Sequence, residues 1–230
     1  LEHKNQFQMT YAYRLHLGKK VKLSLGVNAG LLWYKLNAQD ALLTDPNDPA
    51  FSQNVSRVLP DVGAGLYIYH PNFYFGASVP NFIKGDLTAK NQLGSDAKRT
   101  AHVVLMAGGV ITAGKVLKIR PQIQYRYLAN AQSKIPHTMD FNLSLLIYDR
   151  VNIGGQYRTS FSNKNEGIKL TGPDSFDFML EVWPTKQLMI GYGYDYTLTK
   201  LANFNRGSHE IILGYDFAFE KKKVVTPRYF

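Results

Sequence analysis

The residue types most suggestive of chemistry stand side by side in the segment Gly207-Ser208-His209-Glu210. A hydrolase needs a nucleophile, a base and an orienting group within hydrogen-bonding reach of one another. Neighbouring residues of a strand point to opposite faces of a sheet, so Ser208 and Glu210 would share one side and His209 would lie on the other. The remaining histidines are dispersed, with neither a metal-ligand spacing nor a Gly-x-Ser-x-Gly elbow beside them. We therefore expect no catalytic residues, no metal and no cofactor.

The composition excludes further classes of site. Cysteine is absent, which rules out a disulfide framework, a zinc–cysteine centre and a thiol nucleophile. The net charge of +10 would suit nucleic acid or an anionic membrane surface. The basic residues are scattered, however, with one run at Lys221-Lys222-Lys223, and no recognised nucleic-acid-binding module accompanies them. We expect no nucleic acid among the partners.

Alternation of apolar and polar residues is the main structural signal. No stretch of about 18 consecutive apolar residues is present, so the sequence predicts no transmembrane helix. A barrel strand needs only about ten residues with every second one apolar. In the segment 117–127 one face would carry apolar residues and the other Lys118, Arg120, Gln122, Gln124 and Arg126.

Similar segments recur along the chain and predict eleven strands, although 100–111 is apolar on both faces. They are 7–17, 21–33, 61–69, 73–79, 100–111, 117–127, 139–148, 151–158, 175–183, 188–196 and 211–219.

The connections between these strands alternate strictly in length. Short ones fall near 17–20, 69–72, 113–115, 148–150 and 184–186. Long ones fall at 37–58, 81–98, 128–137, 159–173 and 197–207. A soluble sandwich has no reason to sort its connections, whereas an outer-membrane barrel has short periplasmic turns and longer extracellular loops. The sequence thus predicts an all-β, antiparallel transmembrane outer-membrane β-barrel.

Orientation and strand number follow from the same rule. The last strand leaves a long extracellular loop, so residues 1–219 would form the barrel and residues 220–230 a basic periplasmic tail. A closed bacterial barrel has an even number of strands. Because eleven are visible and no signal peptide stands at Leu1, we expect that one or more N-terminal strands of the full barrel are missing here.

Charged residues of the polar faces would project into the barrel lumen. They could form an ion or solute path, or a polar plug of ion pairs, and the near balance of signs favours the plug. The cations are Arg14, Lys22, Lys118, Arg120, Arg126 and Arg158, and the anions are Asp61, Asp140, Asp177, Glu181, Asp195, Glu210 and Asp216.

Aromatic residues at strand ends would form girdles at the membrane interfaces, with sugar binding as an alternative. They are Tyr11, Tyr13, Trp33, Tyr125, Tyr127, Trp183, Tyr194, Tyr196, Phe217 and Phe219.

The long loops and the tail are the expected partner-binding surfaces, because binding residues concentrate on loops held by a rigid scaffold. The acidic turn at 45–49 could instead bind calcium, although turns of this kind usually do not. The candidate partner-binding residues are Asp45, Asn47, Asp48, Phe51, Lys90, Asn91, Lys164, Lys221, Lys222, Lys223 and Arg228.

The end of the chain, from Gly207-Ser208-His209-Glu210-Ile211-Ile212-Leu213-Gly214-Tyr215 to Thr226-Pro227-Arg228-Tyr229-Phe230, resembles the C-terminus of the PorP/SprF family. Gly63-Ala64-Gly65-Leu66-Tyr67 and Ile153-Gly154-Gly155-Gln156-Tyr157-Arg158 also fit. The resemblance implies an outer-membrane protein of the Bacteroidetes type IX secretion system and gliding motility. It further implies secretion or anchoring of large adhesins through their C-terminal domains, with no catalytic residues.

The leading hypothesis is therefore a non-enzymatic barrel that anchors a secreted surface protein, with other type IX secretion components and outer-membrane lipid as further partners. A small-solute porin is the alternative, but Tyr67, Tyr69, Tyr74 and Met189 would fill the space that a channel needs. An outer-membrane phospholipase is a more distant alternative.

Overall fold

The computed structural model describes residues 2–37, 54–83, 85–86, 98–99, 101–128, 136–161 and 172–217. Most of them belong to β-strands, and a short 3₁₀ helix, η4 (Lys200–Asn203), precedes the last strand. None of these residues forms a helix long and apolar enough to cross a membrane. The strands are β1 (Glu2–His16), β2 (Lys22–Leu36), β3 (Val55–His70), β4 (Phe73–Val79), β5 (Gly85–Asp86), β6 (Lys98–Arg99), β7 (His102–Gly109), β8 (Ile111–Ala113), β9 (Leu117–Leu128), β10 (His137–Ile147), β11 (Val151–Phe161), β12 (Gly172–Val182), β13 (Leu188–Thr197) and β14 (Ser208–Tyr215).

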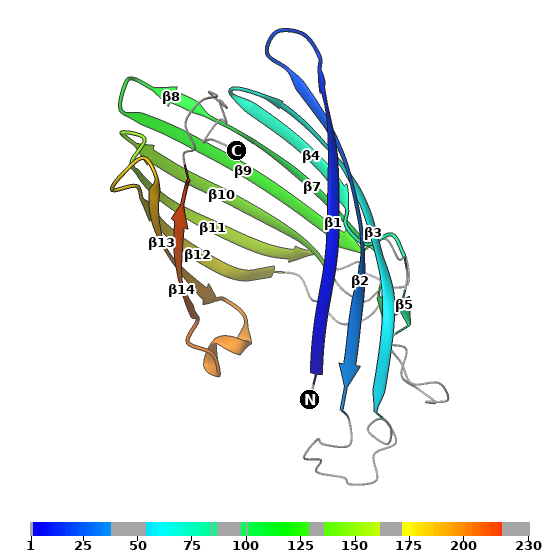
Figure 1. The fold of residues 1–230 in the computed structure, drawn as a ribbon. Coiled ribbons are helices and arrows are strands. Elements are labelled where there is room, and N and C mark those ends of the chain that lie inside the picture. Colours follow the sequence, from blue (N-terminus) through cyan, green and yellow to red (C-terminus); the bar gives the residue numbers. More distant parts are fainter. Residues whose placement is uncertain are drawn as a thin grey trace.

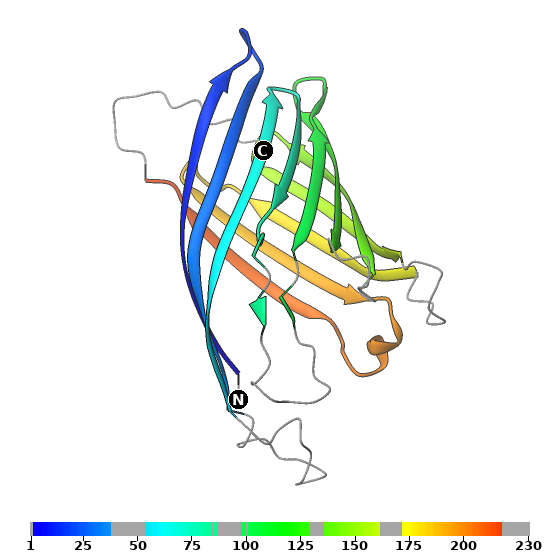
Figure 2. The same cartoon turned by 90° about the vertical axis from the view of Figure 1, so that its right-hand side faces the viewer.

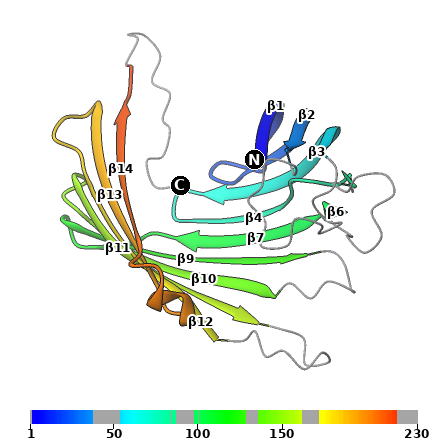
Figure 3. The ribbon, with the colours of Figure 1, turned by 90° about the horizontal axis from the view of Figure 1, so that it is seen from below.

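The strands form one antiparallel sheet in the order β1-β2-β3-β4-β7-β9-β10-β11-β12-β13-β14, with β8 beside β9 (Figure 1). The short strands β5 and β6 pair separately. Figure 3 shows that the sheet curls into a C-shaped wall with β1 and β14 at its two edges. No pairing joins the described residues of these two strands, so the sheet is not closed. The eleven strands along this path confirm the predicted all-β antiparallel fold.

Tight turns join neighbouring strands at one end of the sheet (Figure 2). Between β10 and β11, Tyr148 and Asp149 have φ of 52° and 54°, and the Arg150 N–H donates to the Ile147 carbonyl at 3.0 Å. Positive φ at both central residues defines a type I′ turn, whose twist matches that of antiparallel strands. Three residues, Tyr148 to Arg150, separate the paired Ile147 and Val151.

The two faces of the sheet differ in polarity. On β10, Phe141 and Leu143 face outwards and are 45% and 53% exposed, whereas Asp140 and Ser144 face inwards and are buried. Among the described residues the buried polar side chains, five in number, exceed the four buried hydrophobic ones. Water-soluble proteins show the reverse arrangement. Apolar-out and polar-in alternation is that of a membrane barrel wall.

Several strand ends differ from the sequence prediction, and the pairing of neighbouring strands explains two of them. The strand β3 begins at Val55, so the end of the predicted loop 37–58 is wrong. The reason is that β2 continues to Leu36, which supplies a partner for Val55. The last strand ends at Tyr215, before its predicted end, because its final partner is Leu188, the first residue of β13.

Three other predicted long loops contain regular structure. The strands β11 and β12 extend into 159–173, β5 pairs with β6 within 81–98, and η4 lies within 197–207. The helix forms because the Thr199 hydroxyl caps its first turn by accepting a hydrogen bond from the Leu201 N–H at 3.3 Å.

The weakly patterned segment 100–111 forms a strand that is interrupted after Gly109. The register is the same on both sides of the interruption, from Gly108 opposite Gln122 to Ile111 opposite Ile119, which places Gly109 opposite Pro121. Proline has no N–H to donate, so one rung of the ladder is lost there. The interruption is thus a local consequence of a proline inside a central strand.

Candidate functional site

The inner face of the sheet carries most of the charged residues that could act on a partner or solute. Its character changes across the sheet. We call the inner face of β3–β11 the packed wall and that of β12–β14 the acidic wall.

A buried carboxylate organises one end of the packed wall. Asp140 on β10 is 6% exposed and lies opposite Arg158 on β11 and Gln124 on β9. The Arg158 guanidinium donates to it at 2.8 and 3.5 Å, and Arg126 donates at 3.3 Å. The Gln124 amide adds a contact at 3.5 Å. Because charge-assisted hydrogen bonds reach it from both neighbouring strands, Asp140 ties β9, β10 and β11 together.

Aromatic rings fill the other end of the packed wall. The Tyr67 ring lies 5.4 Å from that of Tyr69 and 5.5 Å from that of Tyr74. Glycines make room for them: a Cβ on Gly108 would lie 2.6 Å from the Tyr74 ring. A Cβ on Gly76 would lie 3.2 Å from Tyr67. The prediction that these tyrosines occupy lumen-facing space is consistent with this packing.

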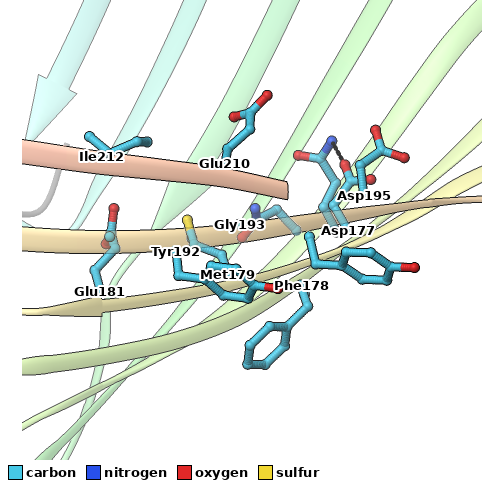
Figure 4. A pocket seen from close by; sticks show the side chains of 14 residues that line it. Asp177, Phe178, Met179, Glu181, Tyr192, Gly193, Asp195, Glu210 and Ile212 are labelled. Atoms are coloured by element: carbon cyan, nitrogen blue, oxygen red, sulfur yellow. Dashed lines mark hydrogen bonds between the residues drawn. The ribbon is translucent and has the colours of Figure 1, made fainter. Parts of the chain in front are cut away.

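The acidic wall surrounds a cavity of about 250 Å³ (Figure 4). Asp177, Glu181, Asp195 and Glu210 line it and lie on one side of the ribbon, while Phe178 points to the other. No ion pair joins any of the four carboxylates to a cation among the residues that the structure describes. Their negative charges are therefore exposed to one another and to the lumen.

Neutral groups are the hydrogen-bond partners of two of these carboxylates. Asp177 accepts hydrogen bonds from the Gln156 amide at 2.9 Å and the Ser175 hydroxyl at 3.1 Å. Glu181 accepts one from the Asn152 amide at 2.8 Å. Asp177 also lies directly opposite Asp195, a like-charge pair that costs stability.

Two glycines of β13 lie beneath the cavity of the acidic wall. Gly191 and Gly193 line the cavity on β13, and a Cβ on Gly193 would have no neighbour closer than 3.8 Å. A Cβ at either glycine would make ordinary van der Waals contacts, unlike a Cβ at Gly108. Within the described ranges no three His, Asp or Glu side chains are arranged to hold a metal ion.

Three of the remaining charged residues, Arg14, Lys22 and Asp61, lie on the inner face, as the alternation predicts. Gln6 on β1 donates a hydrogen bond to the buried Asp61 on β3. Arg14 and Lys22 each lie 5.9 Å from the Tyr69 ring centre. Two residues lie at the end of the wall rather than in it. Lys118 pairs with Asp149 of the turn at 2.5 Å, and Asp216 lies beyond β14.

The Ser–His–Glu segment is divided between the two faces, as predicted. The His209 Nδ1 lies 2.8 Å from the Tyr192 hydroxyl, and its ring packs 4.7 Å from that of Tyr194. Both tyrosines belong to the outward set of β13. Glu210 instead lines the acidic wall, so this segment does not assemble a nucleophile with its base.

The predicted partner-binding residues all lie outside the described residues, so the structure does not place them. They are Asp45, Asn47, Asp48, Phe51, Lys90, Asn91, Lys164, Lys221, Lys222, Lys223 and Arg228. The sequence prediction did not identify the acidic wall as a distinct surface. The available signal was the clustering of inward acids on the last three strands next to alternating glycines at Gly191 and Gly193.

An antiparallel sheet with an apolar exposed face and a polar inner face defines the wall of a β-barrel-like membrane protein. Within that class, the chain belongs to the PorP/SprF family of type IX secretion system membrane proteins, whose family model matches residues 2–215. The resemblance found at the end of the chain is therefore confirmed. No curated protein matches the sequence closely.

Proposed function

We propose that the protein is a non-enzymatic outer-membrane component of type IX secretion and gliding motility. In this role it binds or anchors large secreted surface adhesins through their C-terminal domains. Membership of the PorP/SprF family carries the proposal, since the family consists of type IX secretion system membrane proteins. Other components of the secretion and gliding machinery are its further partners.

The barrel wall acts in this proposal as a platform fixed in the bacterial outer membrane. The sorting of the connections by length supports an orientation with long loops outside the cell and the C-terminus in the periplasm. The parts of 37–58, 81–98 and 159–173 that lie outside the sheet strands then contact the adhesin domain. The basic tail at 220–230 contacts periplasmic components.

The placement of potential catalytic groups supports a non-enzymatic role. Ser208 and His209 lie on opposite faces of β14, so they cannot act on one another within the strand. A lipid-hydrolysis assay on the purified protein is expected to give no turnover. Hydrolysis that depends on Ser208 would contradict this part of the proposal.

A small-solute porin is the second candidate, and the acidic wall favours it. Carboxylates that line a cavity and form no ion pair within the described part of the chain would attract cations to the lumen. The packed wall opposes it, because tyrosine rings occupy space on the same face. Planar-bilayer recordings separate the two: a cation-selective conductance lost on Asp195→Asn would support the porin.

Deletion of the gene in its host tests the main proposal directly. Adhesin secretion and surface display are expected to fall to background and to be restored by the wild-type gene. A variant with Asp45, Asn47 and Asp48 replaced by alanine should restore less display than a matched Asp177→Asn variant, because only the former alters an extracellular loop. Intact secretion and display after deletion would refute the proposal.

A further inference from the structure

A row that contains two glycines and a proline crosses the outward face of the sheet. The register aligns Gly109 on the β7 strand with Pro121 on β9, then with Leu143 on β10 and Gly155 on β11. The neighbouring outward row carries large side chains such as Phe141. The two glycines and the proline thus leave a depression on either side of Leu143, and a glycine within a strand can mark a close approach by a ligand.

This depression is the floor of a groove of about 780 Å³. Ile123, Phe141 and Phe176 form its wall, all of them outward-facing and apolar. The groove falls within the usual size range of ligand sites, about 300–1,000 Å³. Its shape and polarity suit a hydrocarbon chain.

The family consists of membrane proteins. A lipid of the surrounding membrane is therefore the expected occupant of the groove. The groove lies on the face that meets hydrocarbon, where a void would forfeit dispersion contacts with its lining. An acyl chain supplies those contacts without leaving a polar group unpaired. This step requires that the chain lies in a membrane and does not depend on adhesin binding.

Cations lie at the ends of the same strands. Lys115 and Arg150 are exposed in the turns that precede β9 and β11, and Tyr148, in the same turn as Arg150, is also exposed. From Leu143 to Ile147 the strand rises about 13 Å, which is within half the thickness of the hydrocarbon core, about 15 Å. A phosphate at these turns and an acyl chain in the groove therefore fit one lipid molecule.

We propose that the groove across β7 and β9–β12 binds an acyl chain of an anionic phospholipid, whose headgroup phosphate is held by Lys115 and Arg150. The site is distinct from the lipid that surrounds the rest of the apolar face. The bound lipid would fix the position of the sheet in the leaflet next to the short turns. Each cation near that membrane surface adds to the attraction of anionic lipid.

Photocrosslinking tests the site in the full chain reconstituted into phosphatidylcholine nanodiscs. The discs contain a minor share of phosphatidylglycerol with a diazirine on its acyl chain. Crosslinks are expected to concentrate on peptides that contain Phe141 and Phe176, and to be scarce at Met9, which is 69% exposed on the same face of β1. Even labelling of the whole apolar face would overturn the proposal, since it indicates surrounding lipid only.

A variant with a larger side chain in the groove provides a second test of the proposal. Gly155→Leu is expected to lower groove crosslinking about tenfold, the loss that corresponds to roughly two methylene groups of burial. Ala29→Leu is the matched control, because Ala29 is an exposed outward residue on β2, outside the groove. Wild-type crosslinking in a folded Gly155→Leu protein would overturn the proposal.

A variant that leaves the groove unchanged tests whether the two cations bind the headgroup. The same variant tests the proposal if the Gly155→Leu protein does not fold. Lys115→Gln with Arg150→Gln should lower phosphatidylglycerol crosslinking about fivefold per charge and spare diazirine-labelled phosphatidylcholine. Equal loss for both lipids would contradict the headgroup assignment. Labelling in nanodiscs but not in native outer membranes would show that a protein occupies the groove instead.

Discussion

The packed wall and the acidic wall face the same lumen but satisfy their polar groups in different ways. In the packed wall a single carboxylate, Asp140, receives hydrogen bonds from two arginines and a glutamine. In the acidic wall Asp177 and Asp195 lie opposite one another, and among the described residues Asp177 accepts hydrogen bonds from neutral groups alone. The first arrangement holds strands together, whereas the second leaves charge available to a solute or partner.

The inward-facing glycines of the two walls also differ in their surroundings. Gly108 is required by the Tyr74 ring that lies against it, while a Cβ on Gly193 would make only ordinary van der Waals contacts. Inward glycines thus have two roles in one sheet: in the packed wall they admit large neighbours, and in the acidic wall they keep a cavity open. The difference suggests that the packed wall gives the sheet its stability and that the acidic wall is more tolerant of change.

The largest expected effect comes from removing the shared charge of the packed wall. Asp140→Asn should lower the free energy of unfolding by about 2–3 kcal/mol, because Arg126 and Arg158, which are only partly exposed, lose their charged partner. Urea unfolding in lipid vesicles, followed by the fluorescence of Trp33 and Trp183, measures the change.

The matched variant in the acidic wall is Asp177→Asn. It keeps an acceptor for Gln156 and removes repulsion from Asp195, so stability should stay within about 0.5 kcal/mol of wild type or rise slightly. Equal destabilisation by the two substitutions would remove the distinction between the walls.

A smaller effect is expected from adding a methyl group to each kind of glycine. Gly108→Ala should cost about 1–2 kcal/mol, since the Tyr74 ring must move to admit a Cβ. Gly193→Ala, with no neighbour closer than 3.8 Å, should change stability by less than about 0.5 kcal/mol. The same unfolding assay compares them, and a larger cost at Gly193 would show that the acidic wall is also closely packed.

Much of the fold could be predicted from the sequence, because a two-residue period assigns each strand residue to a face without knowledge of its neighbours. It separated His209 from Ser208 and placed Asp140 and Arg158 on the inner face before any pairing was known. Strand ends were less predictable. The start of β3 at Val55 depends on how far its partner β2 extends, which is a property of the pair rather than of either segment.

The site was less predictable for a related reason. Which charges pair depends on register, so the sequence could not show that Asp140 takes both Arg126 and Arg158 while Asp177 faces Asp195. The outward groove depends on alignment of Gly109, Pro121 and Gly155 across three separate strands. Each of these residues, taken alone, predicts only a weakened strand.

The central claim is that the exposed apolar face meets lipid and the polar face lines the lumen. Cysteine is absent from the sequence, so single cysteines at Asn142 and Leu143 can be labelled in outer membranes with a membrane-impermeant maleimide. Leu143 is the more exposed residue in the structure, yet lipid should protect it, and we predict labelling at Asn142 alone. Rapid labelling at Leu143 with protection at Asn142 would contradict the account.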